Sequence, residues 1–468
     1  MESVKKNFFY NSAYQILILI IPLITTPYIA RVLGADGIGI YSYRYSIANY
    51  FMLFIMLGLN NYGNRTIAKI RDNYDELAIN FWSIYYMQLF LGIIINVIYI
   101  VYSIFVSDET AVSLVMGLYV ISSMFDINWL FFGLEKFRFI VGRNFVIKIF
   151  STTLIFLLVK NKSDVLIYCG ILSISTLFSQ IVLWPYVLKV LRPRKIRWKE
   201  ISVHIKPNAF LFLTVIAVSL FKIMDKIMLG VMTNNAQVGF YESSEKVISI
   251  PMALITSLGT VMLPRMSNLI KNNDVESRKV LMRSVVFAMF LATSMGFGIM
   301  SVSNEFVPLF FGPGYDTCKY LLLILLPSCI FLAFANVVRT QFLLPNHMDN
   351  VYVLSAVYGA ITNIIINIIL IPIIGSVGAA IGTLLAELVV CVYQCIKASE
   401  FLPIIEYVKK CCPFIISGII MFLIVYSIEI KGIPLIAVLL TKIIIGIIIY
   451  ACSLGIQLIL LRNYLLID

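Results

Sequence analysis

Long apolar stretches separated by short polar connections run along almost the whole chain. A helix that spans a bilayer needs about 20 mostly apolar residues, and about fourteen stretches reach that length. We therefore predict spanning helices at residues 8–30, 38–62, 79–106, 110–133, 143–160, 164–188, 207–232, 239–263, 281–303, 318–343, 350–372, 375–397, 412–429 and 433–461.

Composition excludes a water-soluble fold. Of the 468 residues, 60% are apolar and only 13% are charged, with a mean hydropathy of +0.95, whereas soluble domains are roughly half apolar. The first apolar stretch is interpreted as a retained span, because it contains Pro22 and Pro27 and leads into Arg31 without a small-residue cleavage site. The sequence predicts an all-α, multi-pass protein of the cell membrane.

The net charge of +12 is explained by membrane topology, and no nucleic-acid partner is expected. Lys and Arg are retained in short cytoplasmic loops. The connections on one side of the membrane carry roughly 25 Lys and Arg residues, and those on the other side carry roughly 5. The side with few basic residues holds only Arg31, Lys160, Lys162, Lys319 and Lys431. Both termini are therefore predicted to be cytoplasmic. The rich side holds Lys5, Lys6, Arg65, Lys69, Arg71, Lys136, Arg138, Arg143, Lys189, Arg192, Arg194, Lys195, Arg197, Lys199, Lys206, Arg265, Lys271, Arg278, Lys279, Arg283, Arg339, Lys397, Lys409, Lys410 and Arg462.

Cysteines and glycines point to packing and turns. None of the eight cysteines forms a C-x-x-C pair, and the two histidines are distant from each other, so no metal site is expected. The glycine-rich piece at residues 34–39 follows a membrane span and lacks the G-x-G-x-x-G order of a nucleotide-binding loop. We predict a tight external turn there, and another at Gly312 to Gly314.

An internal repeat appears when the chain is shifted against itself by about 200 positions. Gly39-Ile40-Tyr41 then aligns with Gly239-Phe240-Tyr241, and Arg65 aligns with Arg265. Six predicted helices separate the copies, so both have the same orientation, as in parallel transporter repeats. We predict an N-terminal lobe (1–190), a basic cytoplasmic loop (191–206), a C-terminal lobe (207–400) and two appended helices (401–468).

Several ionisable residues fall inside the predicted spans. Such groups are costly in hydrocarbon, by about 2.5 to 3.5 kcal/mol each on insertion scales, and usually face a cavity or a partner. The cations form the predicted substrate site, because guanidinium and ammonium groups bind phosphate. This set is Arg31, Arg44, Lys148, Lys222, Lys226 and Lys246.

Helical spacing indicates which cations can be neutralised locally. Glu242 and Lys246 are four residues apart, and Lys222 and Asp225 are three apart, so each pair can meet on one helix face. Arg44 and Lys148 have no acid within a turn, so their partners must lie on another helix or on a ligand. The alternative is that these cations form structural salt bridges or extend to the membrane interface.

Intramembrane acids are candidates for energy coupling. Asp225, Glu245 and Glu387 could carry H⁺ or hold Na⁺ during an alternating-access cycle, or could be paired structurally. No other cofactor is expected.

Motifs spread from about residue 10 to residue 390 resemble the polysaccharide-transporter (Wzx-type, O-antigen flippase) family of the multidrug/oligosaccharidyl-lipid/polysaccharide exporter superfamily. The residues that carry the resemblance are Pro22 to Gly34, Gly37 to Tyr41, Leu57-Gly58, Tyr62-Gly63, Arg65, Trp129, Phe132 to Phe137, Asp225-Lys226, Gly230, Phe311-Gly312, Tyr315, Gln341 to Pro345, Gly378 to Thr383 and Glu387.

The resemblance implies two six-helix lobes in a MATE-like V around a cationic cavity, with two further C-terminal helices. It implies a transporter, not an enzyme, that moves an undecaprenyl-pyrophosphate-linked oligosaccharide from the cytoplasmic to the outer leaflet for O-antigen, capsule or exopolysaccharide synthesis. The polymerase and glycosyltransferases of the same pathway are expected partners.

Two other functions remain open from the sequence. A drug/cation antiporter of the same superfamily would favour an acidic or aromatic cavity over a basic one. A membrane polymerase or ligase of the same pathway would usually present a sizeable external loop, whereas the predicted outer connections are short.

Overall fold

The computed structural model describes residues 2–460, without the side chains of residues 2–19, 137, 213, 214, 217, 218, 220–222, 271, 274 and 460. Every regular element in this range is a helix. Helices suit an apolar chain in lipid because each one satisfies its backbone hydrogen bonds internally. The chain divides into two compact units, residues 1–227 and 228–468, and each is described by itself.

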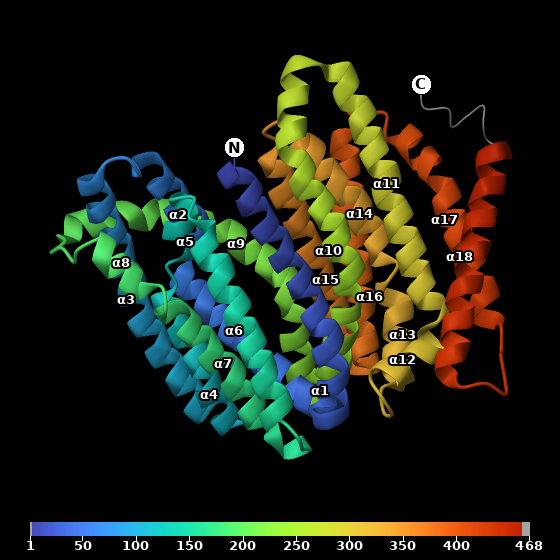
Figure 1. The fold of residues 1–468 in the computed structure, drawn as a ribbon, viewed down its shortest axis with the longest axis horizontal. Coiled ribbons are helices and arrows are strands. Elements are labelled where there is room, and N and C mark those ends of the chain that lie inside the picture. Colours follow the sequence, from blue (N-terminus) through green and yellow to red (C-terminus); the bar gives the residue numbers. More distant parts are fainter. Residues whose placement is uncertain (1, 461–468) are drawn as a thin grey trace. The chain divides into compact units, whose positions relative to one another are not determined.

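The first unit is built from α1 to α8 and most of α9. Helices α4, α6 and α7 lie side by side, and α1 contacts α3, α4 and α6 (Figure 1). The bounds are α1 (Glu2–Met56), α2 (Leu59–Ile70), α3 (Tyr74–Phe105), α4 (Thr110–Ser122), α5 (Asn128–Gly133), α6 (Phe137–Leu158), α7 (Val165–Ile181), α8 (Trp184–Val190) and α9 (Trp198–Met232).

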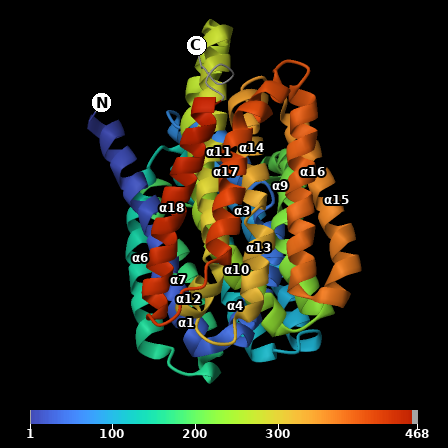
Figure 2. The same cartoon turned by 90° about the vertical axis from the view of Figure 1, so that its right-hand side faces the viewer.

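The second unit is built from α10 to α18. Helices α15 and α16 pack along each other, and α11 contacts both α14 and α17 (Figure 2). The bounds are α10 (Asn235–Asn272), α11 (Asp274–Ser301), α12 (Ser303–Phe310), α13 (Asp316–Leu325), α14 (Ser328–Val338), α15 (Asp349–Ile374), α16 (Ser376–Ala398), α17 (Ile404–Ser427) and α18 (Leu435–Leu460), with a π-helical turn at Arg339–Leu343.

Eleven helical segments in the described part of the chain are long and apolar enough to cross a membrane. The three predicted spans outside this set lie on α1, before and after Gly34, and on α9. The all-α membrane fold is confirmed, while the count of fourteen spans, the V shape and the axis relating the lobes stay predictions.

Two predicted connections are shorter than expected. In the glycine-rich piece only Gly34 leaves the helical conformation, with φ 71°, and α1 resumes at the next residue, so the prediction of a turn over residues 34–39 was wrong beyond its first position. A positive φ favours glycine, which has no Cβ. The basic connection covers only residues 191–197, because α9 already begins at Trp198. The turn at Gly312 and Gly314 is confirmed by φ values of 92° and 86°.

Several predicted spans are interrupted. The second span breaks at Leu57, which has φ 45°, and continues as the separate helix α2. A Cβ on the following Gly58 would lie 2.6 Å from the Leu211 Cβ, so close packing against α9 sets this breakpoint. The tenth span is divided into α13 and α14 at Pro327, which cannot donate a helical backbone hydrogen bond.

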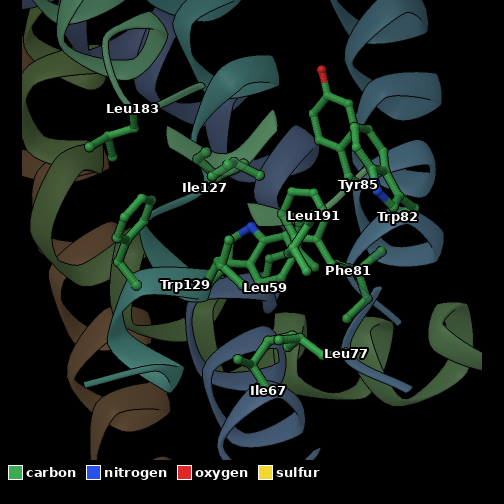
Figure 3. Packing of buried hydrophobic residues seen from close by; sticks show 14 of the residues in the cluster. Leu59, Ile67, Leu77, Phe81, Trp82, Tyr85, Ile127, Trp129, Leu183 and Leu191 are labelled. Carbon is green, nitrogen blue, oxygen red and sulfur yellow. The ribbon is translucent and has the colours of Figure 1, made fainter. Parts of the chain in front are cut away.

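An aromatic core holds one end of the first unit together. Phe81 and Trp82 of α3 lie near Trp129 of α5 (Figure 3). Trp184 of α8 packs against Trp82, with the ring centres 6.3 Å apart. Gln88 fixes the Trp129 indole, whose Nε1–H donates to the Gln88 Oε1 at 3.3 Å. The short helices α2, α5 and α8 are therefore anchored to the long helix α3.

Candidate functional site

Arg44 is the most deeply buried of the predicted substrate-site cations whose side chains are described. Its side chain on α1 is only 4% exposed, and Ala48 one turn later is fully buried. The guanidinium carbon lies 4.7 Å from the centre of the Tyr43 ring, and the phenol of Tyr102 on α3 is close enough to interact with it electrostatically. Its Nε–H is buried without an acceptor.

These neighbours do not neutralise the positive charge of Arg44. Phenols satisfy N–H donors but carry no charge, and among the described residues no ion pair joins Arg44 to a carboxylate. A buried cation of this kind attracts anions strongly because the low dielectric screens little.

The other predicted cations occupy different environments. On α10, Lys246 forms the expected ion pair with Glu242, with Nζ 3.3 Å from Oε1. Arg31 is exposed, whereas Lys148 and Lys226 are partly buried, and each of these three has further polar or electrostatic contacts. Lys222 lies outside the described side chains.

The predicted coupling acids are divided between the units. Asp225 of the first unit is 3% exposed, and Glu387 on α16 of the second is 7% exposed. Both, like Glu245 on α10, interact with neighbouring groups. Glu387 lies near the thiols of Cys329 and Cys391. The roles of these acids and of the cations stay predictions.

Arg143, which was predicted only as one of the cytoplasmic basic residues, lies in a buried hydrogen-bond network. Its side chain is 9% exposed. Its guanidinium donates to the Ser179 carbonyl at 2.8 Å, to the Gln180 Oε1 at 3.1 Å and to the Asn128 Oδ1 at 3.1 Å. These bonds tie α5, α6 and α7 together. In the sequence, the only indication of this network was the presence of the amide residues Asn128 and Asn144 close to Arg143.

A second buried cation, Lys442 on α18, was missed altogether. Its Nζ lies 2.7 Å from the Oε1 of Glu305 on α12, with side-chain exposures of 3% and 12%. The sequence did contain a signal for it. Lys442 lies inside the predicted span 433–461, and an ionisable residue within a span usually has a partner or faces a cavity.

Within the described residues, no group of three or more His, Cys, Asp or Glu side chains could hold a metal ion.

The eleven helices of the described residues that are long and apolar enough to cross a membrane define a multi-pass α-helical membrane protein. The sequence matches the polysaccharide biosynthesis protein family over residues 4–270, more than half of the chain, and the chain belongs to this family. It also matches the lipid II flippase MurJ family over residues 144–441.

Individual relatives agree with this assignment. A putative O-antigen transporter of Escherichia coli (strain K12) is 22% identical over 353 residues, which cover 74% of this chain and 84% of the relative. The structure of a lipid II flippase MurJ in an inward closed conformation superimposes with a TM-score of 0.77 at 15% identity, covering 97% of this chain and 99% of that one. An inward-facing multidrug resistance MATE family transporter gives a TM-score of 0.55 at 11% identity, covering 84% and 99%. At such identities the solved structures establish the fold alone, which is MurJ-like and MATE-like.

Proposed function

We propose that the protein is a flippase that moves a lipid-linked oligosaccharide from the cytoplasmic to the outer leaflet by alternating access. The observation that carries the proposal is the combined family match, which runs from residue 4 to residue 441. The described residues of the chain include eleven candidate spans. The relatives named as an O-antigen transporter and a lipid II flippase support a lipid-linked glycan as substrate. The protein then acts as a transporter and not as a catalyst.

The finer assignment is an undecaprenyl-pyrophosphate-linked repeat unit of O-antigen, capsule or exopolysaccharide. A pyrophosphate needs cations along its route, and Arg44 supplies a buried guanidinium with no carboxylate partner among the described residues. Arginine can bind phosphate oxygens in a bidentate manner, whereas lysine offers a point charge. Arg31, Lys148, Lys222, Lys226 and Lys246 are the further candidates.

Coupling to H⁺ or Na⁺ through Asp225, Glu245 or Glu387 is part of the same proposal. So is cooperation with the polymerase and glycosyltransferases of the pathway. Replacing each acid by its amide and measuring transport against imposed proton and sodium gradients separates the two ions.

The test of the flippase follows lipid-linked repeat units in cells whose own copy of the gene is deleted. The wild-type chain should restore their appearance in the outer leaflet. The Arg44→Ala variant should reduce it about tenfold to a hundredfold, because a hydrogen bond to a charged group contributes about 1.5–3 kcal/mol. Lys162→Ala is the control, because Lys162 is exposed and its connection is predicted to face outward.

Two outcomes would contradict the proposal in different ways. Normal export by Arg44→Ala at wild-type protein level removes Arg44 from the route. Unchanged repeat-unit translocation in the deletion strain itself, together with cation-dependent efflux by the purified protein, would reject the flippase in favour of a drug/cation antiporter.

A further inference from the structure

The two faces of α2 differ sharply. Leu59, Gly63 and Ile67 recur every four residues and are buried against the first unit. The opposite side presents Arg65 and Lys69, which are exposed. A short helix with a buried apolar stripe and a basic outer stripe is typical of a segment that lies at the membrane interface.

A pocket of about 530 Å³ opens between this basic stripe and the start of α9. Arg65 and Lys69 line it from α2, and Lys206 lines it from α9. No carboxylate is among the lining residues, and in the described part of the chain none of these three cations forms an ion pair. The three cations therefore converge on one space without a protein anion to neutralise them.

The rest of the pocket wall consists mainly of apolar side chains and of Tyr62, which a hydrogen bond holds in position. Phe210 is 73% exposed although it lines the pocket beside Pro207 and Leu211. Tyr62 is held by a 2.7 Å hydrogen bond between its hydroxyl and the Nδ1 of His204, and His204 is 5% exposed. The pocket thus combines a preformed polar side with an apolar side.

Its position relative to the bilayer matches this amphiphilic character. Pro207 is the first residue of the predicted span 207–232, and Trp198, 63% exposed at the start of α9, is of the residue type that gathers at membrane interfaces. The charge count assigns Arg65, Lys69 and Lys206 to the cytoplasmic side. An occupant therefore meets cations at the water side and exposed aromatic surface at the lipid side.

We propose that this basic pocket of Arg65, Lys69 and Lys206 binds the phosphate-bearing headgroup of a lipid in the cytoplasmic leaflet, with the start of its chains against Phe210. Basic side chains beside a membrane attract anionic lipids, and the arginine supplies paired donors for phosphate oxygens. A soluble phosphate would use the cations alone and would leave the apolar wall uncovered. None of the predicted transport cations lines the pocket, and the inference does not rest on the proposed function.

Two lipids share this chemistry: a resident anionic phospholipid and a polyprenyl pyrophosphate. The test measures lipid retention on the purified full-length chain by native mass spectrometry. The added probes are phosphatidylglycerol, zwitterionic phosphatidylcholine and undecaprenyl pyrophosphate, each with and without millimolar inorganic phosphate. The variant is Arg65→Gln/Lys69→Gln/Lys206→Gln. The charge-matched control is Arg192→Gln/Lys195→Gln/Lys199→Gln, in the exposed basic connection and at the start of α9.

The pocket variant should retain an anionic lipid about tenfold to a hundredfold less than the wild type, while the control variant retains it normally. Preference for phosphatidylglycerol identifies a phospholipid site, and preference for undecaprenyl pyrophosphate identifies a carrier site. Substituting Lys69→Arg/Lys206→Arg should preserve binding, which separates loss of charge from loss of fold.

Three results would overturn the inference. These are equal retention by the pocket variant, equal retention of phosphatidylcholine and the anionic lipids, or displacement by inorganic phosphate at millimolar concentration. None of them depends on whether oligosaccharides are transported, so failure of this site and failure of the proposed flippase remain distinguishable.

Discussion

Two glycines account for the contact between α2 and α5. A Cβ on Gly63 would lie 2.7 Å from the Trp129 Cε3, and a Cβ on Gly133 would lie 2.6 Å from the Ile67 Cβ. The helices approach so closely because neither glycine carries a side chain. Tyr62-Gly63 and Trp129 are among the motifs that carry the family resemblance, and the structure shows that these two distant pieces pack against each other.

Replacing Gly63 by alanine should therefore destabilise the protein. The new methyl group meets a fully buried indole, and overpacking of this kind costs about 1–3 kcal/mol. Thermal unfolding of the purified protein measures the effect. Gly142→Ala is the control, because a Cβ on Gly142 in α6 would have no neighbour within 4 Å; it should be neutral or stabilising by up to about 1 kcal/mol. Equal melting temperatures for the two variants would contradict the close-packing argument.

At the scale of elements, α17 and α18 pack against α11 and α12 of the same unit through specific contacts. Lys442 pairs with Glu305 at 2.7 Å. The hydroxyls of Thr293 and Tyr450 lie 2.9 Å apart, joining α11 to α18. A buried ion pair in an apolar helix orients that helix, because any other rotation would expose the charge to lipid.

Lys442→Met should destabilise the protein strongly, by about 3–5 kcal/mol, because it leaves the Glu305 carboxylate buried and unpaired. Adding Glu305→Gln should restore part of the loss, since the remaining amide is neutral. Lys431→Met tests an exposed pair with Glu429, 84% and 78% exposed, and should change stability by less than about 1 kcal/mol. Thermal unfolding of the three variants measures these changes in stability. Similar losses of stability for Lys442→Met and Lys431→Met would show that the buried pair does not hold α18 in place.

For the whole molecule, the distribution of Lys and Arg sets the expected orientation in the membrane. Basic residues are translocated poorly, so the connections rich in them stay in the cytoplasm. The predicted orientation has both termini in the cytoplasm.

Labelling of single cysteines in intact cells tests the orientation. In a background with the eight native cysteines replaced, Lys162→Cys should react with a membrane-impermeant maleimide because its connection is predicted to face outward. Lys195→Cys, in the basic connection at residues 191–197, should react only after the cells are opened. The reverse pattern would place both termini outside.

Sequence by itself was sufficient for the helical membrane class and for most span positions, because each span depends on a local run of apolar residues of the length that a bilayer requires. The Glu242–Lys246 pair was also predictable, since residues four apart on one helix must be neighbours. The family motifs were visible for the same reason, as short runs of residues.

Only the tertiary structure decided which charges are enclosed and by what. Four contacts join residues on different helices. They are Tyr102 beside Arg44, the amides of Asn128 and Gln180 on Arg143, the carboxylate beside Lys442, and the convergence of Lys206 with α2. Burial and neutralisation depend on these contacts between helices, and a linear pattern of apolar residues contains no information about which faces of two distant helices meet.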